Sequence, residues 1–301
     1  MEKVTYFGRV GCVRLFNGTV ELIATVDVGP RIIRYGFPGE DNILGELPDV
    51  SIETPLGQWK PWGGHRLWTA PEANPRSYVP DNAPVEYRPE GKHGVHLTQQ
   101  VERETGIQKE LTITLDDEGS RVRVRHVITN RNLWAIDVAP WAITNMNAGG
   151  TAILPQEPYR SWDEYLLPAR PFVLWHYTDL SDPRWTIGSR YVRLRSDEQQ
   201  TAPQKAGILN KQGWAGYYRH GTLFIKRFDY EEGADYPDYG SNAEVYTGGS
   251  TMEVESLSPI RRLEPGESAL HVENWELFPN VKLGSTEDEI EAAIGPLLKS
   301  E

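Results

Sequence analysis

Two short stretches of this 301-residue chain combine residue types that could carry acid–base chemistry. In the first, GGHRLWTAPE (63–72), the residues His65, Arg66 and Trp68 follow a Gly-Gly pair. Paired glycines let a backbone approach a ligand closely, histidine exchanges protons near neutral pH, and arginine offers planar donors to oxygen-rich ligands. Tryptophan adds an apolar stacking face. We predict that this segment lines a ligand site, and the alternative is a glycine turn with surface His and Arg.

The second stretch is an acidic strand, TMEVESLSP (251–259). Glu253 and Glu255 are two residues apart and share one face of a strand, while Met252 and Val254 take the opposite face. Adjacent carboxylates repel each other, so we expect the pKa of one to rise toward neutrality, where it can act as a general base. The alternative is a solvent-exposed strand face that carries two glutamates.

A polar segment rich in tyrosine covers residues 226–247 and suits hydroxyl recognition. Its candidate binding residues are Lys226, Arg227, Asp238, Asn242 and Glu244. An ordinary solvent-exposed loop is the alternative for this segment.

Residues 132–150 are mostly apolar, which predicts that Trp134 and Trp141 belong to the core. Asn145 and Asn147 share a strand face in this segment and are candidates to face a pocket.

Metal and cofactor signals are weak in this sequence. His93 and His96 are three residues apart in HGVH, but a metal would need at least one further ligand of defined geometry. Cys12 is the only cysteine, which excludes an intrachain disulfide and a multi-cysteine zinc site. Fingerprints of dinucleotide binding, phosphate-binding loops, serine hydrolases and zinc peptidases are absent. We therefore expect neither a metal nor a cofactor.

The elements that must position these residues are predicted to be strands. Polar and apolar residues alternate with period two, which is typical of strands with one buried face. This alternation occurs at 19–28, 108–115, 121–128, 190–195, 222–228, 251–257 and 268–277.

Turn residues separate these strands. Asp117-Glu118-Gly119 predicts a hairpin, and Pro265-Gly266 predicts a type II turn. The Pro- and Gly-rich stretches 38–63, 71–91 and 155–171 predict long loops, and nearby tryptophans indicate that these loops are ordered and line a site.

One helix is predicted, at the C-terminal end. Ser285 can cap it, Asp288 completes a capping box, and Pro296 limits its length. With no internal repeat and no clear boundary, we predict a single antiparallel β domain over residues 1–283, with a helix in 284–301 packed on it.

Charge and composition exclude several classes of protein. The formal net charge is −12, so bulk attraction to nucleic acid or to an anionic membrane is not expected. No segment approaches the roughly 18 apolar residues of a membrane helix, and no signal-peptide pattern is visible. We expect a cytoplasmic protein that binds neither nucleic acid nor membrane.

Read in order, these motifs resemble the galactose mutarotase-like (aldose 1-epimerase-like) superfamily. The stretch VELIATVDVGPRIIRYGFPGEDNIL (20–44), with Gly29, Arg31 and Ile32, is similar to that family's opening strands. GGHRLW resembles its His-bearing loop, and MEVES, LEPGES and HVENWEL resemble its last strands. The likeness covers most of residues 4–278 and is greatest to an uncharacterised bacterial branch with GGHRLW and E-x-E motifs.

The resemblance implies an all-β supersandwich of antiparallel strands with a concave sugar-binding face. It implies Glu255 as general base and His65 as general acid at the anomeric carbon of a small carbohydrate, with His93 and His96 as alternative acids. Trp68 would stack on the sugar. The remaining substrate-binding residues would be Arg31, Arg66, Asn145, Lys226, Asp238, Asn242, Glu244 and Glu253.

The sequence departs from the family pattern at two of these positions. Asn145 stands where the family has a second active-site histidine, and Glu253 stands where it usually has an apolar or small residue. Two other functions on the same scaffold therefore stay open: a non-catalytic carbohydrate-binding protein, and a polysaccharide-active lyase or hydrolase.

Overall fold

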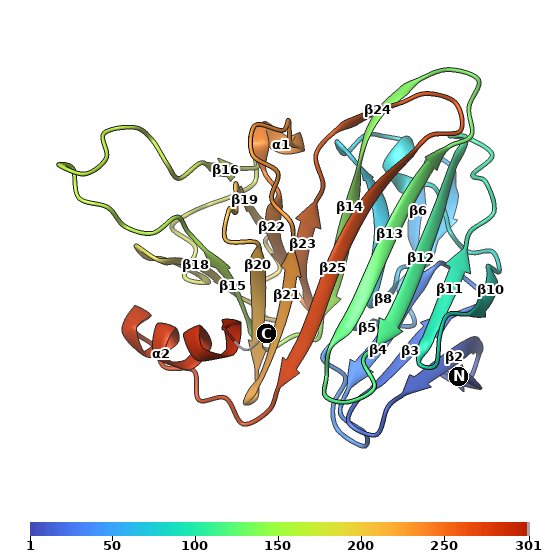
Figure 1. The fold of residues 1–301 in the computed structure, drawn as a ribbon, viewed down its shortest axis with the longest axis horizontal. Helices are drawn as coiled ribbons and strands as arrows, with labels where there is room; N and C mark the ends of the chain where they lie inside the picture. Colours follow the sequence, from blue (N-terminus) through green and yellow to red (C-terminus); the bar gives the residue numbers. More distant parts are fainter. Residues whose placement is uncertain (300–301) are drawn as a thin grey trace.

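The computed structural model describes residues 1–299, and strands make up nearly all of their regular structure (Figure 1). The predicted strands are confirmed as β3 (Glu21–Thr25), β12 (Ile107–Leu115), β13 (Val122–Asn130), β18 (Tyr191–Arg195), β21 (Thr222–Phe228), β23 (Thr251–Leu257) and β25 (Ser268–Phe278). In β12 every second residue is buried, as the alternating sequence predicts.

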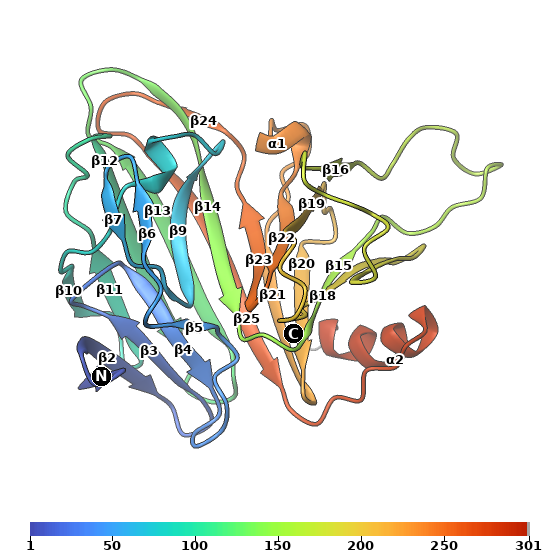
Figure 2. The same cartoon turned by 180° about the vertical axis from the view of Figure 1, so that it is seen from behind.

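Two large antiparallel sheets form the body of the molecule. The 11-stranded sheet, on the viewer's side in Figure 2, has the order β1 (Glu2–Tyr6), β2 (Val10–Phe16), β3, β4 (Arg31–Gly36), β9 (His65–Ala70), β14 (Ile136–Met146), β23, β22 (Ala243–Gly248), β19 (Gln204–Ile208) and β16 (Phe172–Leu174), with β24 (Arg261–Leu263) paired to β14.

The second sheet has ten strands and lies in front in Figure 1. Its order is β10 (Glu86–Pro89), β11 (Gly94–Thr98), β12, β13, β25, β21, β20 (Trp214–Arg219), β15 (Thr151–Pro155), β18 and β17 (Trp185–Ile187). Strand β25 pairs with β13 on one side and with β21 on the other.

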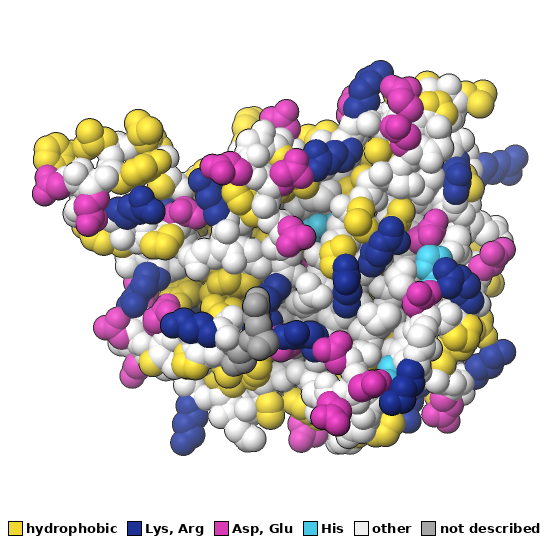
Figure 3. Space-filling view, in the orientation of Figure 1, with side chains coloured by type: hydrophobic (Ala, Val, Ile, Leu, Met, Phe, Trp, Pro, Cys, Tyr) yellow, Lys and Arg dark blue, Asp and Glu magenta, His cyan; other side chains and the backbone are white. Residues whose placement is uncertain are grey.

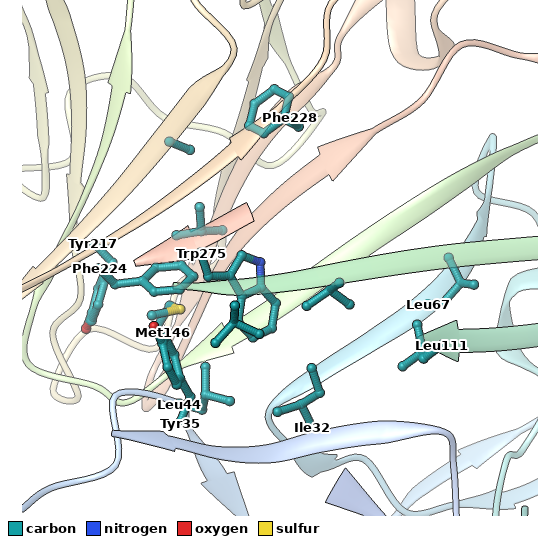
Figure 4. Close-up of a cluster of buried hydrophobic side chains, with 14 of the residues drawn as sticks. Ile32, Tyr35, Leu44, Leu67, Leu111, Met146, Tyr217, Phe224, Phe228 and Trp275 are labelled. Carbon is teal, nitrogen blue, oxygen red and sulfur yellow. The ribbon is translucent and has the colours of Figure 1, made fainter. Parts of the chain in front are cut away.

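The main core lies between these two sheets. Ile32 and Leu67 from the 11-stranded sheet and Leu111 and Trp275 from the 10-stranded sheet belong to one buried hydrophobic cluster (Figure 4). Burial of each such side chain stabilises the fold by about 1.5–3 kcal/mol, so the strand faces that carry them are fixed by the apolar pattern.

The predicted Pro-Gly turn is present, but two of the stretches predicted as long loops contain regular structure. The stretch 71–91 includes a 3-10 turn at Arg76–Tyr78 and strand β10, and the stretch 38–63 includes four short strands. The β24–β25 turn has Gly266 at a φ of 87° after Pro265, and Glu267 N donates to Glu264 O at 3.0 Å, as in a type II turn. The stretch 38–63 folds into two small hairpin sheets, in which β5 (Glu46–Leu47) pairs with β8 (Trp62–Gly63) and β6 (Ile52–Thr54) pairs with β7 (Gly57–Trp59).

The loop between β15 and β16 projects from the body, and yellow side chains gather on it in Figure 3. Trp162 is 77% exposed there, so it is not a site-lining residue. The prediction that Trp134 belongs to the core is also wrong, because it lies in a surface turn and is 64% exposed.

Of the two elements labelled as α-helices, only α2 has regular helical geometry. α1 (Pro237–Gly240) is a four-residue turn after β21 in which Asp238 and Tyr239 have positive φ angles of 50° and 57°. α2 (Glu287–Leu298) packs Ile290 and Ile294 against the 10-stranded sheet. The cap of α2 is Thr286 with Glu289, one residue later than the predicted Ser285–Asp288 box. Pro296 lies inside the last turn rather than ending the helix.

Within residues 1–299, no helix combines the length and the apolar character needed to cross a membrane.

Candidate functional site

A groove of about 540 Å³ lies on the outer face of the 11-stranded sheet. Its walls include the aromatic side chains Trp59, Trp68, Tyr78, Trp141, Trp175, Tyr177 and Tyr246. Its polar lining includes Arg66, Glu72, Asn145, Lys205 and Glu253. We call this the aromatic groove. An apolar, aromatic wall with few polar groups is the usual composition of a small-molecule site.

The register of three strands explains which motif residues reach the aromatic groove. Arg66 in β9, Ile143 in β14 and Glu255 in β23 are direct cross-strand partners and share one face of the sheet. The next set of cross-strand partners is His65, Thr144 and Val254. Their side chains point to the opposite face of the sheet, because side chains alternate along a strand.

The E-x-E glutamates do share the groove side of β23, as predicted, but each has a cation of its own. Glu253 Oε1 lies 3.0 Å from Arg66 Nη2. Glu255 Oε2 accepts from Trp141 Nε1 at 2.7 Å and from Lys205 Nζ at 3.1 Å. Glu255 is fully buried behind these two side chains. Its Oε1 has no hydrogen-bond partner among the described residues.

Lys205 is a central residue of the site that sequence reasoning missed. Its Nζ lies 2.8 Å from Glu244 Oε2 and 3.1 Å from Glu255 Oε2. The same atom lies 4.7 Å from the ring centres of Trp141 and Trp175. The available signal was a lysine directly before the small and apolar residues Ala-Gly-Ile in the strand QKAGI.

Burial and charge set the protonation of this group. Burial chiefly raises the pKa of the Glu244 carboxyl well above its usual value, against the pull of Lys205. Burial lowers the pKa of Lys205, but attraction to Glu244 and Glu255 outweighs it and leaves the pKa well above its usual value. Lys205 is therefore a fixed cation at neutral pH.

Asn145 lines the aromatic groove as predicted, and it is only 1% exposed. Neither its Oδ1 nor its Nδ2 has a hydrogen-bond partner among the described residues. Buried amides are normally paired, since an unpaired polar group costs about 1–3 kcal/mol. The amide is thus free to donate to and accept from a bound molecule.

Three other predicted binding residues, Arg31, Asn242 and Asp238, are not among the residues that line the groove. Arg31 is fully buried and pairs with both carboxylate oxygens of Asp81, at 2.5 and 2.6 Å. Asn242 bonds the backbone N and O of Asn210 at 2.6 and 2.9 Å. Asp238 lies beside Glu244, and burial raises the pKa of its carboxyl.

The prediction that His65 and Lys226 belong to the site is wrong, because both side chains face the core between the sheets. Lys226 Nζ lies 2.6 Å from Glu273 Oε1, and both side chains are fully buried. His65 Nε2 lies 2.7 Å from His126 Nε2, and His65 Nδ1 lies 2.9 Å from Thr144 Oγ1. The structure therefore does not bring His65 and Glu255 to the same side of the sheet.

We call His65, His126, His271, Glu273 and Lys226 the buried histidine cluster. His126 Nδ1 lies 3.1 Å from the His271 carbonyl oxygen and must carry its proton there, so His126 Nε2 accepts from His65 Nε2. Burial lowers the pKa of His126 to about 4 and of His271 to about 3. Burial also lowers the pKa of His65 well below its usual value.

The nitrogen and carboxylate atoms of His65, His126 and Glu273 lie within 4.8 Å of one another. Their spacing fits a hydrogen-bond network better than a metal site. The two Nε2 atoms are 2.7 Å apart, whereas two nitrogens on one tetrahedral zinc would be roughly 3.3 Å apart. The Lys226 ammonium on Glu273 also adds positive charge where a cation would sit.

The alternative acids lie at the 10-stranded sheet, His96 within β11 and His93 in the bend that precedes it. His96 belongs to β11, where its neighbours Val95 and Leu97 are buried in the core, so its side chain has the outer face. It lies 3.3 Å from Glu110, and His93 lies 3.6 Å from Asp117.

No protein-family model matches the sequence, and no curated protein matches it. Solved structures match over most of the chain. A TPR-domain containing protein from Parabacteroides distasonis has a TM-score of 0.59 and 16% identity over 92% of this chain, and this chain spans about half (49%) of that protein.

Two further structures match along most or all of their own length. A galactose mutarotase-like protein from Lactobacillus casei has a TM-score of 0.56 and 12% identity, covering 89% of this chain and 100% of that one. A proposed mutarotase from Salmonella typhimurium has a TM-score of 0.59 and 10% identity, covering 92% and 93%. At these identities the likeness concerns the fold, and the fold of this chain is galactose mutarotase-like.

Proposed function

We propose that this protein binds a carbohydrate in the aromatic groove and acts on it as an aldose 1-epimerase-like enzyme. The observation that carries the proposal is Asn145, a buried amide without a partner among the described residues, in a groove walled by tryptophans. Indole faces pack against the C–H faces of sugars, and an amide both donates to and accepts from hydroxyls. The likeness to mutarotase-like structures supports the same reading.

For the chemical step we propose Glu255 as the general base that removes the proton from the anomeric hydroxyl O1. Its Oε2 is held by Trp141 and Lys205, whereas Oε1 is unpartnered among the described residues. Because these two side chains cover the carboxylate, the substrate must displace one of them to reach it.

The acid that protonates the ring oxygen O5 must belong to the groove side of the sheet, so His65 does not suit this role. We propose Tyr246, which lines the aromatic groove as the cross-strand partner of Glu253. Burial chiefly raises the pKa of its phenol, which therefore keeps its proton at neutral pH. Proton transfer from O1 to Glu255 and from Tyr246 to O5 breaks the C1–O5 bond, and reversal after rotation gives the other anomer.

Exchange NMR of anomer interconversion, with a panel of aldoses, tests this function. We expect Glu255→Gln and Tyr246→Phe to slow interconversion by about 10²–10⁴-fold while binding persists. Tyr239→Phe is the matched control, since that side chain is 95% exposed. Equal rates for wild type and Glu255→Gln would refute the catalytic assignment.

A non-catalytic carbohydrate-binding protein is the second candidate. The complete burial of Glu255, with His65 on the opposite sheet face, favours it. Binding without faster interconversion is its expected result. A hydrolase fits less well, because Glu253 and Glu255 extend from the same strand in the same direction and each is already ion-paired.

A further inference from the structure

The aromatic groove has an excess of carboxyl groups over cations. Arg66 and Lys205 are the only basic residues among the described residues that line it. Glu72 and Glu253 also line it, and Glu244 and Glu255 lie directly behind Lys205. Two cations thus face four carboxyl groups.

Each cation is already paired with a carboxyl group of the protein, and Arg66 Nε has no hydrogen-bond partner among the described residues. Arg66 pairs with Glu253 at 3.0 Å, and its guanidinium stacks over Trp59 and Trp68, 5.4 and 4.6 Å from their ring centres. Lys205 Nζ lies 2.8 Å from Glu244 Oε2 and 3.1 Å from Glu255 Oε2, and two indole rings lie beside it.

Glu72 is the carboxylate that stays available at the rim of the groove. It is exposed and accepts a hydrogen bond from the Tyr78 hydroxyl. The Tyr78 ring packs edge-on against Trp68, with ring centres 5.0 Å apart. A carboxylate beside aromatic faces attracts an ammonium group by charge and by cation–π contact.

The unpartnered amide of Asn145 gives independent evidence for a ligand in the same groove. Resting on the carbohydrate function proposed above, we propose that the aromatic groove selects sugars that carry a protonated amine and rejects sugar acids and sugar phosphates.

Saturation-transfer NMR with competing sugars tests this selectivity. The probes are glucosamine, glucose, glucuronic acid and glucose 6-phosphate, together with galactosamine, galactose and galacturonic acid, at neutral pH and low salt. We expect each amino sugar to bind roughly tenfold more tightly than its neutral counterpart, and this advantage to shrink with added salt. Binding of the acids and the phosphate should be weakest.

Two variants locate the effect. Glu72→Gln should remove the advantage in affinity that the amino sugar has over its neutral counterpart. Glu253→Gln should release Arg66 and let glucuronic or galacturonic acid bind. Glu118→Gln, which removes an exposed charge in the β12–β13 turn, controls for net charge and should change neither.

Equal affinity for amino and neutral sugars, or tighter binding of an acid or phosphate, would overturn the selectivity and leave the carbohydrate function standing. An amino-sugar preference that survives Glu72→Gln would overturn the assigned position of the amine. If no sugar of any charge binds, the carbohydrate function itself fails, and the selectivity fails with it.

Discussion

Asn145 is a buried side chain whose polar atoms contribute no hydrogen bond to the folded protein among the described residues. Asn145→Leu removes two unpaired polar groups, so the free energy of unfolding should stay unchanged or rise by about 1 kcal/mol. Sugar binding should be lost at the same time. Urea unfolding and NMR binding measure the two effects.

Asn242 provides the matched comparison, because its amide is also buried but bonds the backbone of Asn210 on both sides. Asn242→Leu should lower the free energy of unfolding by about 2–4 kcal/mol. A destabilised Asn145→Leu variant would show that this amide serves the fold and not a ligand.

Individual residues were predictable where their neighbours on the same strand settle the strand face. Glu253 reaches the groove because its apolar neighbours Met252 and Val254 bury the opposite face of the strand. His65 and Lys226 were misassigned, since an ionisable side chain normally avoids a core. Their burial depends on partners more than 40 residues away, His126 and Glu273, which strand alternation does not reveal.

At the scale of single elements, the C-terminal helix offers a direct test of capping. Thr286 accepts from Glu289 N, and the Glu289 carboxylate bonds the Thr286 backbone N–H. Thr286→Ala should lower the free energy of unfolding by about 1 kcal/mol, because one N-terminal backbone donor loses its partner.

Ser285→Ala is the control for this cap. Ser285 contacts Glu289 through its backbone N–H, which alanine keeps. The change in the free energy of unfolding, measured in urea, should be close to zero. If Ser285→Ala lowers this free energy more than Thr286→Ala does, Ser285 is the cap, as expected from sequence.

Strands and tight turns of this protein were predictable, because period-two alternation and Pro-Gly chemistry are local signals. The shift of the cap by one residue shows the limit of such signals, since Ser285 and Thr286 each have an acidic residue three positions later. Strand β19 was missed because Gln204, Lys205 and Gly207 interrupt any apolar alternation.

At the scale of the whole molecule, the buried histidine cluster couples acid titration to the packing of the two sheets. Histidine in the unfolded chain titrates near 6.5, whereas in the folded protein the pKa is about 4 for His126 and about 3 for His271. Between these values the unfolded chain binds protons that the folded protein does not, so stability falls as pH falls.

We therefore expect the free energy of unfolding to decrease below pH 6.5, with a slope of up to about 1.4 kcal/mol per pH unit for each buried histidine. The pKa of Glu273, lowered below its usual range because Lys226 and the histidines outweigh the effect of burial, adds to the loss at lower pH. Urea unfolding at several pH values measures this slope.

His176→Gln is the control for acid stability, because His176 is exposed. It should leave the slope unchanged. Constant stability from pH 7 to 5 would contradict the neutral, hydrogen-bonded state of the cluster.

The position of β25 governs the order in which the chain can fold. It is the only strand among the described residues that pairs with both β13 and β21, so it joins the two halves of the 10-stranded sheet. During synthesis, the edge of β13 therefore stays without its partner strand until residues 268–278 have been made. Such long-range pairing predicts slow folding and makes the nascent chain dependent on protection from aggregation.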